Sequence, residues 1–83
     1  MKMTGMNFVA VIAKLESMRK ADFIAIFGGN EDHGLGQHLY GKLYHVQSSV
    51  RYLDVTALFH FDIENRNKLV NRCIELIEVD KAA

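Results

Sequence analysis

The chain has 83 residues and no formal net charge, since ten acidic side chains balance ten basic ones. A chain of this length holds one domain at most, so residues 1–83 are expected to fold together around a small core. Charge balance argues against nucleic acids and anionic membranes as partners, because both are bound largely through an excess of basic side chains.

The N-terminal segment, from about residue 4 to residue 18, has the pattern of an amphipathic helix. Thr4 is a suitable N-cap. The apolar side chains that follow recur at the spacing of one helical face: Phe8, Val11, Ile12, Leu15 and Met18. Arg19 and Asp22 would fall on that apolar face, which predicts a bend before a second short helix over residues 23–27, capped by Asp22.

Two short apolar runs in this region, residues 8–12 and 23–27, are also compatible with buried strands. We favour helix for both because the rest of the chain offers no obvious strand partner. The alternative of strand at either place stays open.

A glycine-rich stretch over residues 28–34 is the one strong break in the chain. It lacks the lysine and hydroxyl residue that end a nucleotide-binding P-loop, so we interpret it as an interhelical loop. His33 and His38 provide a metal-binding alternative, but their spacing is not that of a helical zinc pair. We therefore assign no metal ligands and expect no cofactor.

A third helix is predicted over residues 35–50, because Leu35, Leu39, Leu43, Val46 and Val50 form a narrow apolar stripe. Asp54 is a suitable cap for a short helix over residues 55–61, and Asp62 for a last helix over residues 63–79. The predicted fold class is all-α, a single helical domain arranged as a compact bundle of four to five helices.

The third helix also carries the predicted contact surface. Tyr40, Tyr44 and Arg51 share one flank of the leucine stripe, and these residue types are enriched at binding hot spots. Gly41 lies opposite the stripe, where glycine costs roughly 1 kcal/mol of helix stability and permits close approach by another backbone. We assign Phe27 to the same partner-binding surface. The alternative is that the flank residues only border the core.

The chain offers few groups for catalysis. Cys73 is the only cysteine and falls within the apolar arc of the last helix, which suits a buried packing residue. A lone thiol without a signal peptide also predicts a cytoplasmic protein. Arg66, Lys68 and Arg72 on that helix provide an alternative nucleic-acid surface, but acidic neighbours offset their charge. We expect neither an enzyme nor a membrane protein.

The hydrophobic fraction of 49% is high for so short a chain. Because a small protein has much surface and little interior, some apolar side chains should stay exposed and mark a contact site. The leading hypothesis is a small non-enzymatic regulatory or inhibitory protein that acts by protein–protein binding as a homodimer, its partner unidentified. The alternatives are a DNA-binding regulator using the last helix and a metal-dependent function through His33 and His38.

Overall fold

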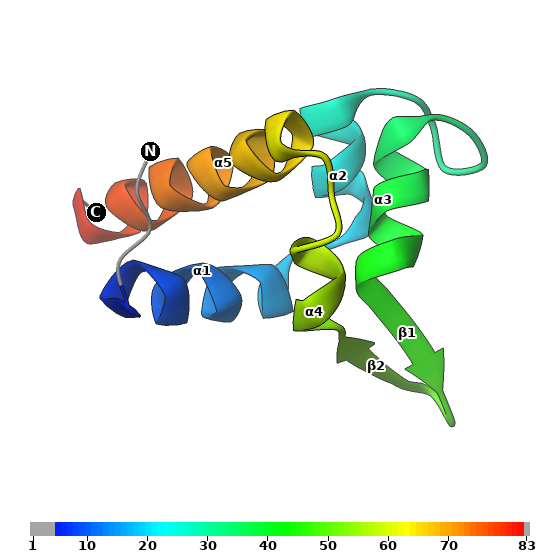
Figure 1. Ribbon diagram of the computed structural model, residues 1–83, viewed down its shortest axis with the longest axis horizontal. Coiled ribbons are helices and arrows are strands. Elements are labelled where there is room, and N and C mark those ends of the chain that lie inside the picture. The colour runs from blue at the N-terminus through cyan, green and yellow to red at the C-terminus, as the bar shows by residue number, and fades with distance from the viewer. Residues whose placement is uncertain (1–4, 83) are drawn as a thin grey trace.

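The computed structural model describes residues 5–82, which form five helices and one β-hairpin (Figure 1). The helices are α1 (Gly5–Ser17), α2 (Lys20–Phe27), α3 (Leu35–Leu43), α4 (Val55–Leu58) and α5 (Ile63–Ala82), and the strands are β1 (Tyr44–Gln47) and β2 (Val50–Leu53). Helices α1 and α5 pack together, α2 and α3 form a second pair, and the hairpin extends away from the helices (Figure 1).

The hairpin makes the prediction of an all-α fold wrong. The protein is helix-dominated but mixed, because the segment expected to complete a helix over residues 35–50 leaves it at Leu43 and pairs with residues 50–53 as an antiparallel sheet. Helix α3 ends where the amide of Tyr44 donates to the carbonyl of Tyr40. The chain then turns back at Ser48 and Ser49.

Local preferences explain why the third helix stops early. From Tyr44 onward the chain is rich in aromatic and β-branched residues, which fit a pleated strand better than a helix. Val46 is 72% exposed and Val50 is 49% exposed. The predicted apolar stripe of residues 35–50 is therefore not a buried face at these two valines. The helical spacing of residues 35–50 was therefore coincidental at its C-terminal end.

The first two helices follow the prediction closely. Residues 8–12 lie in α1 and residues 23–27 lie in α2, so the preference for helix over strand is confirmed at both places. The expected bend falls between Ser17 and Lys20. Asp22 does stabilise the start of α2, but from the third position of the helix: its carboxylate accepts the amide of Arg19 at 2.8 Å. The expected cap at Thr4 lies outside the described residues.

The loop over residues 28–34 joins α2 to α3, as the glycine content predicted. The amide of Gly36 donates to the carbonyl of Gly28 across the loop at 3.1 Å. Gly36 is buried where α3 crosses α2, and a Cβ atom there would lie 2.7 Å from the Cα of Ile24. This close helix crossing requires glycine.

The last two helices complete one hydrophobic core. Helix α4 is a single turn after Asp54, shorter than the helix expected over residues 55–61, and α5 extends three residues beyond the expected end. Every helix and β1 contribute side chains to the buried cluster: Val11, Leu15, Met18, Phe23, Leu39, Leu43, Tyr44, Leu58, Phe61, Leu69, Val70 and Cys73.

Candidate functional site

The hairpin has two faces of different character. Antiparallel pairing sets Tyr44 opposite Leu53 and Val46 opposite Arg51. These four residues share the face turned toward the helices, which we call the inner face. The outer face carries the other two pairs, His45 with Tyr52 and Gln47 with Val50.

Arg51 joins the inner face to the end of α1. Its guanidinium donates to the backbone carbonyls of Glu16 and Met18, and to the hydroxyl of Tyr40 at 3.0 Å. The last carbonyls of a helix have no partner within the helix. Arg51 therefore supplies hydrogen bonds and a positive charge at the end of α1 where both are favourable.

Tyr44 lies beneath Arg51 in an aromatic cluster. The Arg51 guanidinium carbon is 4.6 Å from the centre of the Tyr44 ring, and the rings of Tyr40 and Tyr44 stack with centres 4.6 Å apart. Phe23 meets both tyrosines edge-on. The Tyr44 hydroxyl donates to the carbonyl of Leu15, and burial raises the pKa of this phenol well above its usual range.

The structure thus brings together three of the residues assigned to the contact surface, Tyr40, Tyr44 and Arg51, but inside the fold. Tyr44 is only 5% exposed, whereas Tyr40 and Arg51 are half-buried. Their polar tips are satisfied by one another and by the end of α1. A role in partner binding stays a prediction for Tyr40 and Arg51, while Tyr44 belongs to the core.

The other two assigned residues lie apart from this cluster. Phe27 is half-buried, with its ring 6.2 Å from that of Phe23 and its side chain packed against the core. Gly41 is exposed, and nothing lies within 4 Å of the position a Cβ atom would take. Within the described chain the close helix approach therefore occurs at Gly36, and approach by a second copy at Gly41 stays a prediction.

The outer face of the hairpin leaves apolar side chains exposed. All four of its residues are exposed, and Tyr52 is 52% exposed beside Val50. His45 lies opposite Tyr52 and reaches across to the start of α4, where its Nε2 is 3.5 Å from a carboxylate oxygen of Asp54. A hydrogen bond from the hydroxyl of Thr56 lowers the pKa of the Asp54 carboxyl.

His33 lies in the loop over residues 28–34, and His38 lies on α3. In the part of the chain that the structure describes, no group of three or more histidine, cysteine, aspartate and glutamate side chains could hold a metal ion. His33 and His38 are both exposed. The side-chain oxygen of Asn30 accepts the amides of Asp32 and His33, so it serves to shape the loop.

The basic residues of α5 are spread over different environments. Lys68 and Arg72 are exposed beside α2, around a hollow of about 430 Å³ that also involves Ala25 and Ile26. Arg66 is half-buried, and Arg72 is paired with Glu75 at 3.1 Å. No observation on this helix favours nucleic acid over solvent as the neighbour of these side chains.

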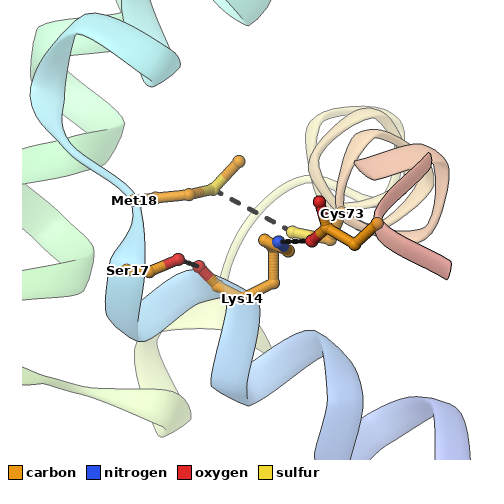
Figure 2. A network of polar contacts seen from close by, with 5 residues as sticks. Lys14, Ser17, Met18 and Cys73 are labelled. Carbon is orange, nitrogen blue, oxygen red and sulfur yellow. Dashed lines mark hydrogen bonds and ion pairs between the residues drawn. The ribbon is translucent and has the colours of Figure 1, made fainter. Parts of the chain in front are cut away.

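Cys73 is buried at the contact of α1 and α5, where its sulfur lies 4.0 Å from that of Met18 (Figure 2). Lys14 of α1 also reaches α5 there and pairs with Asp80. Burial raises the pKa of the Cys73 thiol to about 11. The thiolate is the nucleophilic form of cysteine, so this residue is suited to packing and not to catalysis.

No family model, curated protein or solved structure matches this chain. Function has to be inferred from the residues themselves. Among the described helices, none has both the length and the apolar composition needed to cross a bilayer.

The sequence prediction missed the residues that the fold leaves exposed on the hairpin, Val46, Val50 and Tyr52. A signal for them was present. Two serines separate two runs of four residues rich in valine and tyrosine, which is the layout of a short hairpin with a two-residue turn. The regular leucine spacing before them concealed that signal.

Proposed function

We propose that this chain is a small non-enzymatic regulatory or inhibitory protein, that it acts by stoichiometric protein–protein binding and that it forms a homodimer. The exposed apolar hairpin supports the proposal. Val46, Val50 and Tyr52 lie on the two four-residue strands of the hairpin, which extends from the helices, and these side chains are 72%, 49% and 52% exposed.

The position of these residues matters more than their number. Scattered exposed apolar side chains are normal on a protein surface. A two-stranded sheet is marginal in water by itself, and here its inner face is fixed by Arg51 and Tyr44 while its outer face is bare. A preorganised, exposed hairpin binds a partner with little loss of conformational freedom.

The groups that the fold brings together suit contact better than chemistry. The Cys73 thiol is buried with a raised pKa, and the Tyr44 phenol is likewise engaged inside the core. Tyrosine is a frequent binding hot spot because its ring is large, rigid and amphipathic. Tyr52, exposed in the middle of the outer face, is the residue we expect to contribute most to partner binding.

The proposal is tested by sedimentation of the purified protein over a range of concentrations, together with affinity capture by wild-type and Tyr52→Glu proteins. We expect a species of twice the 9.4 kDa chain mass. We also expect a partner protein, retained in fixed stoichiometry, that Tyr52→Glu loses. An exposed lysine on α3 provides the control, because Lys42→Glu should retain the partner. A monomer at all concentrations, with no partner that depends on Tyr52, would contradict the proposal.

A further inference from the structure

The outer edge of β1, the side facing away from β2, has unused backbone hydrogen-bonding groups. The amide of Asp54 donates to the carbonyl of Leu43 at 2.7 Å, just beyond the last strand pair. Hydrogen-bonded and non-hydrogen-bonded pairs alternate along an antiparallel ladder. Val46 and Arg51 therefore form a non-hydrogen-bonded pair, and the N–H and C=O groups of Val46 point away from β2.

We propose that two copies of this chain pair through the outer edge of β1, antiparallel and centred on Val46, so that two hairpins form one four-stranded sheet. The inference rests on the proposed function, because it specifies how the homodimer is made. At the centre of the interface, Val46 donates its amide to Val46 of the partner subunit and accepts the same bond in return.

Symmetry makes this edge self-complementary. A twofold dimer requires one surface to match itself, so a residue at the axis meets its own copy. Val46 supplies both a donor and an acceptor to that axis, and its side chain, 72% exposed in the single chain, packs against the same side chain across it. The sheet gains two strands, which removes the marginal state of an isolated hairpin.

The charges also favour a second copy as the occupant of this edge. Proteins commonly protect exposed edge strands with lysine, proline or other charged residues. Strand β1 reads Tyr-His-Val-Gln and carries none of these. The whole chain has no formal net charge, so two copies approach without overall repulsion.

The outer edge of β2 is a poor alternative. Pairing centred on Arg51 would bring two guanidinium groups together across the axis, and like charges directly opposite each other destabilise a sheet. That edge also borders a hollow of about 430 Å³ whose lining includes Glu16 and Arg51. The geometry therefore selects β1.

Two exposed valines, Val46 on the hairpin and Val79 on α5, give a matched test by sedimentation equilibrium. Val46→Lys places two ammonium groups side by side at the axis and should raise the dimer dissociation constant at least about tenfold. Val79→Lys makes the same chemical change on α5, at a side chain that is 62% exposed and outside the hairpin, and should change that constant no more than about twofold. Circular dichroism of both variants establishes that each is folded.

Amide hydrogen exchange provides a second readout that a misfolded variant cannot imitate. The Val46 amide points to solvent in a single chain, so its slow exchange in wild-type protein, fading on dilution, is the expected result. Val46→Pro removes that amide at a position where an edge strand accepts proline, and should give a folded monomer. Rapid exchange at Val46 in a proven dimer would overturn the inference.

The outcomes separate this inference from the proposed function. A dimer that Val46→Lys and Val46→Pro leave intact contradicts pairing through β1 while leaving the homodimer in place. A wild-type protein that is monomeric at every concentration contradicts the homodimer itself. Equal weakening by Val46→Lys and Val79→Lys would show that the added charge acts wherever it is placed, and would overturn edge pairing.

Discussion

Arg51 is the residue on which the junction between the hairpin and α1 depends. Its guanidinium reaches two backbone carbonyls near the end of α1 and one tyrosine hydroxyl, and it lies over the Tyr44 ring. A planar guanidinium with several fixed donors can satisfy these acceptors at once, which a lysine ammonium cannot do in the same geometry.

Removal of that guanidinium should therefore be costly. We expect Arg51→Met to lower the free energy of unfolding by about 2 kcal/mol, because hydrogen bonds from a charged donor contribute about 1.5–3 kcal/mol and the carbonyls of Glu16 and Met18 would lose their partner. Denaturation in urea measures the change. Lys42→Met, which removes a positive charge at an exposed site, should stay within about 0.5 kcal/mol of wild type. An equal loss of unfolding free energy in both variants would contradict the stabilising role of Arg51 between the hairpin and α1.

At the scale of the element, α3 contains two glycines that the fold uses differently. Gly36 faces α2, where an added Cβ would lie 2.7 Å from both the Cα of Ile24 and the carbonyl oxygen of Phe23. Gly41 faces open space one and a half turns later. The sequence prediction attached the close approach to Gly41, because its mid-helix position is visible in the sequence whereas the crossing with α2 is not.

Alanine at each position should therefore have opposite effects. Gly36→Ala should destabilise the protein by about 1–3 kcal/mol, since the two backbones must separate to admit the methyl group. Gly41→Ala should stabilise it by up to about 1 kcal/mol, through helix propensity. Thermal unfolding of both variants measures the difference. A loss of stability in Gly41→Ala that grows with protein concentration would instead indicate that a second copy approaches there.

The first and last helices, α1 and α5, were predictable from local patterns. Val11 and Leu15 recur at helical spacing and are buried on one face of α1, and Met18, just after its end, is buried as well. Helix α5 follows its own periodicity after Asp62. The hairpin was not predictable in the same way, because the leucines and valines of residues 35–50 are spaced three or four residues apart, as in a helix. Residues 44–47 pair with residues 50–53 across the sheet, whereas the helical pattern predicted one continuous helix up to residue 50.

At the scale of the whole molecule, two titratable groups lie buried where the elements meet. Tyr44 of β1 contacts Leu15 of α1 and Phe23 of α2. Cys73 of α5 contacts Met18, just after the end of α1. Burial raises the pKa of both, which means that the folded state binds these protons more tightly than the unfolded chain. Stability from this source is fully present below the unfolded pKa and is lost as the pH rises beyond it.

We therefore expect the free energy of unfolding to fall as the pH rises from the ordinary thiol pKa of 9.0 toward about 11, where folded Cys73 itself ionises. Urea denaturation at a series of pH values measures the slope. Cys73→Ala should flatten the part of that slope between pH 9 and pH 11, whatever its effect at neutral pH. An unchanged slope in this variant would contradict a raised pKa of Cys73 in the folded protein.

The sequence by itself determined the small size, the charge balance, the helices at both ends and the glycine-rich loop between α2 and α3, because each of these follows from composition or from contacts between near neighbours. Only the tertiary structure decided that α3 stops at Leu43, that Tyr44 is buried and Val46 is exposed, and that Gly36 marks the helix crossing. Those outcomes depend on which distant segment lies opposite each residue. Helical periodicity does not contain that information, because it records only which side chains share a face.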